Sequence, residues 1–221
     1  MKERFPEELK AIFFDMDGVL LDSERVWRDE YGDAFWNDIG VKELPPALSE
    51  QIYGISMHDE HAILQREIGL SLTLDEYIAK YDKYSDLVYS SAKLAENLEE
   101  TLSHCKETGL YIAIVTSSVG NWVEKVLRRL SKDYFDLVVA VPDHPELKPK
   151  PQPDPYLYTL QRSGFRANQV IAVEDSNRGI QAAVTAGIYT IASAEFVNEE
   201  YEQKEYNLLL KKLANLTDLI K

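Results

Sequence analysis

Acidic residues follow two apolar runs of this sequence, and their types and spacing suit the binding of a hard cation. Asp15 and Asp17 directly follow one apolar run, and Glu174 and Asp175 directly follow another. Three or four carboxylates brought together repel each other and retain protons unless a cation lies among them. Carboxylate oxygens with retained waters are the ligands that Mg²⁺ prefers. The sequence therefore predicts a Mg²⁺ site built from these four residues.

Donors that could hold an anion beside such a metal occur in two other segments. Thr116 and Ser117 follow the apolar run 111–115, and Lys150 lies in a Pro-rich segment. A lysine and a hydroxyl can hold phosphoryl oxygens, and backbone N–H groups at strand-to-helix turns can add to them. From these residues we predict a Mg²⁺-dependent phosphate site in which a carboxylate is available as the nucleophile.

The elements that must position these residues alternate between strand and helix. Helical patterns end at Gly109, Gly164 and Gly187, and a further helix is expected near the C-terminus. Apolar runs predict strands at 11–15, 111–115, 137–141, 170–173 and 188–191. Repeated units of this length predict an α/β fold with a parallel sheet covered by helices on both faces. Ligands of such sheets bind at the carboxyl ends of the strands, where the polar residues lie.

A helical block interrupts this alternation after the first strand. Residues 24–95 are predicted to be nearly all helical, beginning with a helix over 24–39. Two residue pairs have the spacing of capping boxes, namely Ser56 with Asp59 and Thr73 with Glu76. We therefore predict two domains, an α/β core of residues 1–22 and 97–221 and a helical domain of residues 23–96.

Composition and charge narrow the class of protein further. The 221 residues are 45% hydrophobic, which is enough to bury a core and excludes a disordered chain. Lys and Arg number 24 against 38 Asp and Glu, for a net charge of −14. Such a surface repels phosphate backbones and anionic lipids, so we expect neither a nucleic-acid nor a membrane partner. The N-terminal residues lack the pattern of a signal peptide, so we expect a cytoplasmic protein. We expect it to be a monomer or a homodimer.

Four motifs, in order along the chain, resemble those of the haloacid dehalogenase-like hydrolase superfamily. They are FFDMDGVLLDSE at 13–24, IVTSS at 114–118, KPQPDP at 150–155 and IAVEDSNRGIQAA at 171–183. The similarity covers nearly the whole chain and is strongest to the phosphatase branch, whose helical cap follows the first motif. It implies a Rossmann-like parallel-sheet core with an inserted all-helical cap domain.

The resemblance also implies roles for the catalytic residues. Asp15 corresponds to the nucleophile that forms an aspartyl-phosphate. Asp17 corresponds to the general acid for the leaving oxygen and later to the base for the hydrolytic water. Thr116 and Lys150 correspond to the residues that hold the transferring phosphoryl group. The family pattern K-P-x-P-D-P fits from Lys150, although Lys148 offers a second lysine two residues earlier.

Metal and substrate contacts follow from the same resemblance. Asp175 is expected to ligate Mg²⁺ together with Asp15 and the backbone carbonyl of Asp17, and Glu174 to support the metal directly or through water. Substrate contacts are expected at Thr116 and Lys150, and further ones at Ser117, Trp27 and Asn177. Packing alone is the alternative role of Trp27, and Asn177 is expected to help position the leaving group. Ser118 is expected to cap the helix that follows the second motif.

Residues that differ between this sequence and other groups of the family favour a phosphatase acting on small phosphorylated metabolites, above all sugar phosphates. Asp17 argues against dehalogenases, which lack a second Asp. The sugar-phosphate mutases have a His at the position of Trp27 and a cap Arg at the position of Met57. A mutase of the beta-phosphoglucomutase type and a catalytically silent binding protein are the alternatives.

Overall fold

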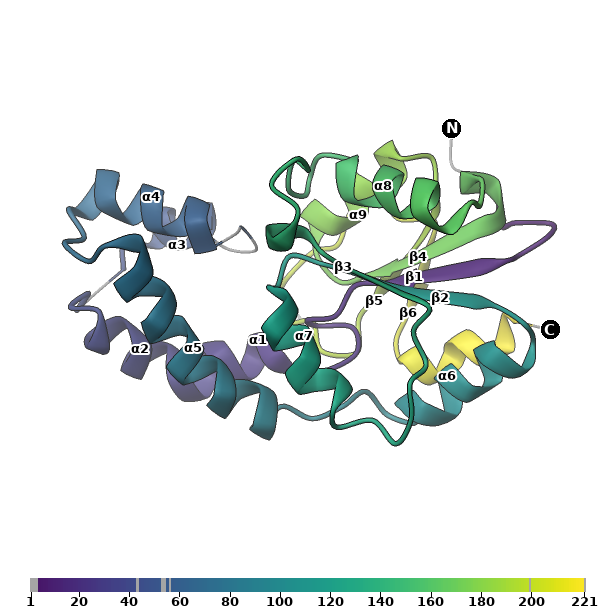
Figure 1. Ribbon diagram of the computed structural model, residues 1–221, viewed down its shortest axis with the longest axis horizontal. Coiled ribbons are helices and arrows are strands. Elements are labelled where there is room, and N and C mark those ends of the chain that lie inside the picture. Colours follow the sequence, from purple (N-terminus) through teal and green to yellow (C-terminus); the bar gives the residue numbers. More distant parts are fainter. Residues whose placement is uncertain (1–3, 43, 53–54, 56, 199, 221) are drawn as a thin grey trace. The chain divides into compact units, whose positions relative to one another are not determined.

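A six-stranded parallel sheet forms the centre of the larger part of the chain. The computed structural model describes residues 4–42, 44–52, 55, 57–198 and 200–220. Within them the strands lie in the order β3-β2-β1-β4-β5-β6 (Figure 1). Their bounds are β1 Ala11–Phe14, β2 Tyr111–Thr116, β3 Leu137–Ala140, β4 Val170–Glu174, β5 Tyr189–Ser193 and β6 Leu208–Leu210. The predicted α/β fold class is confirmed, and β1 lies between β2 and β4, both of which follow it in the chain.

Helices cover both faces of the sheet, as Figure 1 shows, with α8 and α9 on one side and α6 and α7 on the other. These helices are α6 Leu98–Glu107, α7 Gly120–Leu127, α8 Asp154–Ser163 and α9 Asn177–Thr185. Alternate strand residues such as Phe13 and Ala172 pack against Tyr156 of α8 and Ala182 of α9, and all four are fully buried. Strands buried on both faces read as continuous apolar runs, which is why they are visible in the sequence.

Residues 23–92 form a helical unit with its own aromatic core. Its helices are α1 Ser23–Val26, a π-helix Trp27–Tyr31, α2 Gly32–Asp38, α3 Pro46–Ile52, α4 Met57–Ile68 and α5 Leu74–Ser91. The Phe35 ring lies 4.5 to 5.8 Å, centroid to centroid, from the rings of Trp27, Tyr77, Tyr81 and Tyr84. Aromatic pairs at these distances add to the energy of simple burial. This core holds the helices of the unit together.

The capping box expected at Thr73 and Glu76 is present at the start of α5. The Glu76 N–H donates to the Thr73 hydroxyl, and the Glu76 carboxylate accepts from the Thr73 N–H at 2.8 Å. In the other expected pair, Ser56 with Asp59, Ser56 lies outside the described residues.

The C-terminal region differs from the sequence prediction. A short strand, β6, pairs with β5 there, and the only helix after it in the described residues is a 3₁₀-helix at Leu213–Asp218. The sequence pattern predicts a helix in this region and no strand. The three residues of β6 are too few to show a period in the sequence.

Contacts divide the chain into two compact units, Met1–Asp22 with Lys93–Lys221, and Ser23–Ala92. The division lies at or near the expected domain boundaries at 22/23 and 96/97, although independent folding of the two parts stays a prediction.

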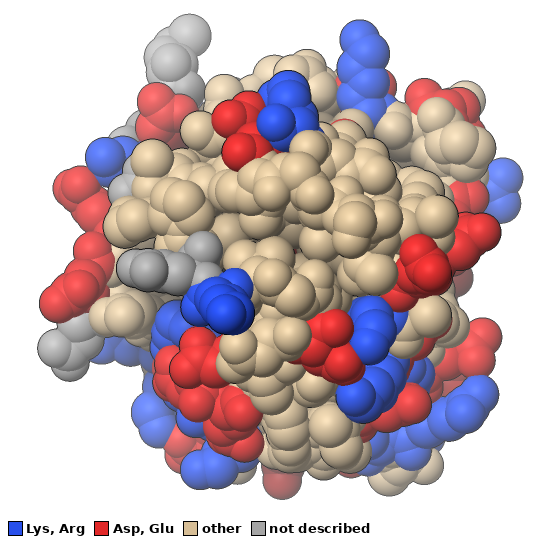
Figure 2. Space-filling model, turned by 90° about the vertical axis from the view of Figure 1, so that its left-hand side faces the viewer, with Lys and Arg blue, Asp and Glu red and all other residues tan. Residues whose placement is uncertain are grey.

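Acidic and basic side chains are interspersed on the face that Figure 2 presents. Every helix in the described parts of the chain is too short or too polar to cross a bilayer.

Candidate active site

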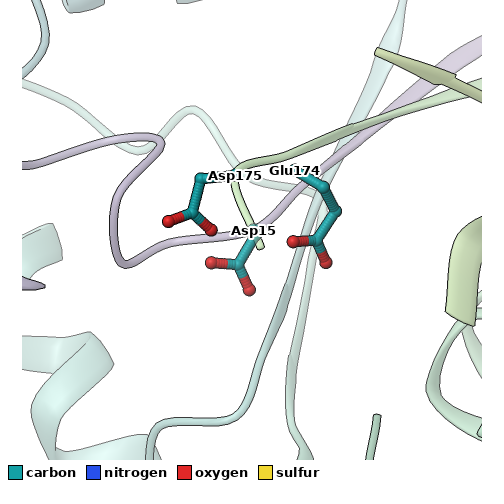
Figure 3. A group of neighbouring side chains, drawn as sticks. All are labelled: Asp15, Glu174 and Asp175. Atoms are coloured by element: carbon teal, nitrogen blue, oxygen red, sulfur yellow. The ribbon is translucent and has the colours of Figure 1, made fainter. Parts of the chain in front are cut away.

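The pairing of β1 with its two neighbours determines where Asp15 lies. Phe14, the last residue of β1, stands opposite Ile114 of β2 and Val173 of β4. The Asp15 N–H continues the ladder by donating to the Val173 carbonyl at 2.9 Å. Asp15 and Glu174 therefore come next to each other at the carboxyl ends of adjacent parallel strands (Figure 3).

Lys150 joins these two carboxylates. Its Nζ donates to Asp15 Oδ1 at 2.6 Å, to Glu174 Oε1 at 2.6 Å and to the Val115 carbonyl at 2.8 Å. An ammonium has three donors, so these three acceptors use all of them. Lys150 is only 4% exposed, whereas Lys148 is exposed at the surface. Of the two lysines in the Pro-rich segment, Lys150 is the one that the fold brings to the carboxylates.

Burial and charge shift the titration of this cluster in opposite directions. Burial raises the pKa of Asp15 well above its ordinary value; Lys150 opposes this rise, and the Glu174 and Asp17 carboxylates add to it. Burial alone would lower the pKa of Lys150, but Asp15 and Glu174 outweigh it and raise that pKa. The lysine thus stays charged, and one positive charge does not offset the buried carboxylates.

Glu174 uses its two oxygens differently. Oε1 accepts from Lys150 Nζ and also from the Tyr156 hydroxyl, each at 2.6 Å. Oε2 is buried and accepts no hydrogen bond from the residues that the structure describes. An ideal Cβ at Gly179, in the first turn of α9, would overlap this carboxylate. The helix can therefore approach Glu174 so closely only because residue 179 has no side chain.

Asp175 lies against the loop that follows β1. Gly18 has φ +75°, and an ideal Cβ there would overlap Asp175 Oδ2, so this turn requires glycine for two reasons. Gln203 holds the Asp175 backbone, because its Nε2 donates to the carbonyls of Asp175 and Ser193 at 2.6 and 2.8 Å. Asp175 is buried, at 7% exposed.

The segment after β2 contacts the first motif through Ser118. The Ser118 hydroxyl donates to Asp17 Oδ2 at 2.6 Å, and its N–H donates to the Thr116 hydroxyl at 3.0 Å. The prediction that Ser118 caps the next helix is wrong, because Val119 is the N-cap of α7 and makes no side-chain capping bond. Thr116 is buried and Ser117 is half-buried at the end of β2.

For the two remaining residues predicted to touch the substrate, Asn177 and Trp27, the structure shows contacts within the protein, and their contacts with the substrate stay predictions. Both ends of the Asn177 amide hold the backbone of a later segment: Nδ2 donates to the Glu202 carbonyl at 2.8 Å, and Oδ1 accepts from the Lys204 N–H at 2.7 Å. Trp27 is half-buried in the helical unit, where its ring packs against Phe35 and Tyr81.

Three residues that contact the site carry no clear sign of this role in the sequence. They are Tyr156 on Glu174, Gln203 on the Asp175 backbone and, in its observed role, Ser118 on Asp17. Tyr156 follows directly on the third motif, and its position there was the one signal available. Gln203 lies in an irregular segment with no pattern that points to β4.

The carboxylates fit a divalent cation. Asp15, Glu174 and Asp175 each offer an oxygen, and these oxygens lie within 4.8 Å of one another (Figure 3). All three residues are buried, and one Glu174 oxygen has no partner among the described residues. Buried, uncompensated carboxylate oxygens are the donor set that Mg²⁺ takes. The Asp17 side chain is not part of this group, and its expected contribution through the backbone carbonyl stays a prediction.

Comparisons with known proteins agree with this architecture. The family model described as haloacid dehalogenase-like hydrolase matches residues 12–193. A phosphorylated carbohydrates phosphatase of Thermotoga maritima is 30% identical over 193 residues, 83% of this chain and 84% of that protein. Hexitol phosphatase B of Escherichia coli is 27% identical over 230 residues, 97% of this chain and 96% of that protein. The structure of CbbY from Rhodobacter sphaeroides in complex with phosphate has a TM-score of 0.80 at 22% identity and covers 94% of this chain and 96% of that one.

Proposed function

Because the chain belongs to the haloacid dehalogenase-like hydrolase family, we propose that it is a Mg²⁺-dependent phosphatase of small phosphorylated metabolites, above all sugar phosphates. The observation that carries the proposal is the buried cluster in which Lys150 joins Asp15 to Glu174, with Asp175 beside them. The names of the two curated relatives, phosphatases of phosphorylated carbohydrates and of hexitols, support the substrate class.

In the first step, a carboxylate oxygen of Asp15 attacks the phosphorus of the monoester. The bond between phosphorus and the alcohol oxygen breaks, and Asp17 gives its proton to that leaving oxygen. The product is an aspartyl-phosphate on Asp15 and a free alcohol. Ser118 holds Asp17 Oδ2 at 2.6 Å, which supports a fixed orientation for the acid.

In the second step, water attacks the phosphorus of the aspartyl-phosphate while Asp17 takes a proton from that water. The bond between phosphorus and the Asp15 oxygen breaks, which restores the Asp15 carboxylate and releases inorganic phosphate. Thr116 holds a phosphoryl oxygen in both steps, and Lys150 does so by exchanging its bond to Asp15 Oδ1 for a bond to the phosphoryl group. The buried, charged Lys150 lies where negative charge gathers, and a preoriented charge of this kind supplies much of the rate of phosphoryl transfer.

Asp15, Glu174 and Asp175 would hold the Mg²⁺. When bound, the ion offsets negative charge on the transferring phosphoryl group. A bound ion would also explain why the fold tolerates three buried carboxylates beside one lysine, because burial without it raises the pKa of Asp15.

The alternative of a sugar-phosphate mutase differs in the fate of the phosphoryl group, which passes to a sugar hydroxyl instead of water. Mutases of the family place an Arg in the cap for the second phosphate, and this chain has Met57 there. A thioether cannot hold a phosphate, so the residue favours hydrolysis.

The test is phosphate release from a panel of phosphorylated sugars, sugar alcohols, nucleotides and small acids, with Mg²⁺ and with excess EDTA. We expect release with Mg²⁺, none with EDTA, and none from Asp15→Asn. Asp218→Asn, which alters an exposed carboxylate near the C-terminus, is the matched control and should leave release unchanged. Turnover by Asp15→Asn or in EDTA would refute the proposal, and isomerised sugar phosphate without phosphate release would show a mutase.

A further inference from the structure

Tyr156 places a hydroxyl group at the inner end of the candidate active site. The residue lies in the first turn of α8 and is fully buried among apolar side chains of the sheet and α9, including Phe13 and Ala172. Its hydroxyl donates to Glu174 Oε1 at 2.6 Å. A tyrosine hydroxyl has one O–H donor, and in Tyr156 that donor is used by Glu174.

The two oxygens of the Glu174 carboxylate differ in their hydrogen bonds. Lys150 and Tyr156 both donate to Oε1, while Oε2 is buried and receives nothing from the described residues. A buried carboxylate oxygen without a partner is costly, and a bound cation removes that cost. Gly179 leaves no free space beside the carboxylate, so the group is confined on that side as well.

We propose that Tyr156 is a positioning residue for the metal, because it fixes which oxygen of Glu174 is presented as a ligand. With two donors on Oε1, the carboxylate cannot rotate to exchange its two oxygens without breaking both hydrogen bonds. With Lys150 alone, the two oxygens can exchange at the cost of one bond. Partners that orient a metal ligand in this way typically contribute 10- to 100-fold to metal affinity or activity. This inference rests on the proposed metal site of the phosphatase.

Tyr156→Phe isolates the hydroxyl from the ring. The Lys150 ammonium lies 5.4 Å from the Tyr156 ring centroid, and a Phe ring keeps this contact and fills the same apolar space. Tyr158→Phe is the matched control, since Tyr158 is on the same helix but its ring packs against His144, 4.9 Å away between centroids. Both variants lose one hydroxyl from α8, and only one of these hydroxyls touches Glu174.

The experiment measures Mg²⁺ binding calorimetrically and Mn²⁺ binding by electron paramagnetic resonance, both without substrate. We expect Tyr156→Phe to weaken binding by about tenfold or more, and Tyr158→Phe to leave it unchanged. Because the Tyr156 hydroxyl has no role toward the phosphoryl group, phosphate release by Tyr156→Phe should recover at saturating Mg²⁺. The concentration of Mg²⁺ for half-maximal activity should rise by the same factor as the dissociation constant.

A second comparison separates positioning from general damage to the fold. In a Glu174→Gln background the hydroxyl has no charged ligand to orient, so adding Tyr156→Phe should change metal affinity less than twofold. Equal losses in both backgrounds, or wild-type metal affinity in Tyr156→Phe, would overturn the inference while leaving the phosphatase proposal intact. A wild-type protein that neither binds Mg²⁺ nor releases phosphate would instead overturn the proposed function.

Discussion

A buried carboxylate in the helical unit, Glu60 of α4, should make the folded protein less stable as the pH rises. Glu60 is 6% exposed, and its Oε2 accepts from the Tyr81 hydroxyl at 2.7 Å. Burial raises the pKa of Glu60 from 4.5 to about 7; the Tyr81 hydrogen bond opposes the rise, and the Glu24 carboxylate adds to it. Between these two values the folded protein holds a proton that the unfolded chain has released.

The sign and size of the effect follow from this difference in bound protons. Since the folded state binds more protons than the unfolded state, the free energy of unfolding falls as pH rises through this range and is constant above it. A shift from 4.5 to about 7, at about 1.4 kcal/mol per pKa unit, corresponds to a loss of about 3 kcal/mol. Below 4.5 both states are protonated and Glu60 contributes nothing to the pH dependence.

Glu60→Gln tests this reasoning, because the amide oxygen still accepts from Tyr81 and has no proton to lose. Urea unfolding of both proteins over a pH series should show the wild type losing about 3 kcal/mol relative to the variant as the pH rises from about 4.5 to about 7. Glu67→Gln, an exposed carboxylate on the same helix, should show a much smaller change with pH. A difference between wild type and Glu60→Gln that is flat with pH, or that grows in favour of the wild type, would refute the argument.

Three other substitutions, one of them with a glycine control, test the site and the helical unit. Lys150→Met leaves two buried carboxylates without their cation, so urea unfolding should show a loss of about 3 to 5 kcal/mol, and phosphate release should fall at least 10²- to 10³-fold. Gly18→Ala forces a Cβ into the Asp175 carboxylate and should weaken Mg²⁺ binding about tenfold or more in calorimetry. Gly40 also has a positive φ, +83°, but lies in open space, so Gly40→Ala should cost only about 1 to 2 kcal/mol of stability. Thr73→Ala removes the capping box of α5 and should lower the free energy of unfolding by about 1 kcal/mol with phosphate release at wild-type levels.

The alternation of strand and helix and the nature of the central strands could be predicted from the sequence. β1, β2 and β4 are buried along nearly their whole length, and the carboxyl ends of parallel neighbours must meet at one edge. That rule predicts that Asp15 and Glu174 lie at the same edge of the sheet, because each comes at the end of its apolar run. The pairing of β1 with β4, which makes the two residues neighbours, is seen only in the structure. From the sequence, Lys150 could be chosen over Lys148 only because it fits the family motif. The structure adds the contact of Lys150 Nζ with Asp15 Oδ1.

The contacts between distant segments could not be predicted in this way. Ser118 has the residue type and position of a helix cap, but its hydroxyl reaches a carboxylate 101 positions away. The Asn177 amide holds a segment 25 residues later, which no local pattern encodes. The π-helix at Trp27–Tyr31 lies inside a stretch with ordinary helical periodicity. For Ser118 and Asn177, contacts with distant segments, not local preference, determine the outcome.

The central claim is that Asp15 carries the phosphoryl group, and trapping that intermediate tests it most directly. In Asp17→Asn, an aryl phosphate with a leaving group that needs no proton should still phosphorylate Asp15, while hydrolysis of the intermediate lacks its base. Acid quenching in the presence of Mg²⁺, followed by borohydride reduction, converts an acyl phosphate to an alcohol. We expect peptide mass spectrometry to find homoserine at position 15. Reduction at another carboxylate, or an unmodified Asp15 while the aryl alcohol is released in a burst, would contradict the account.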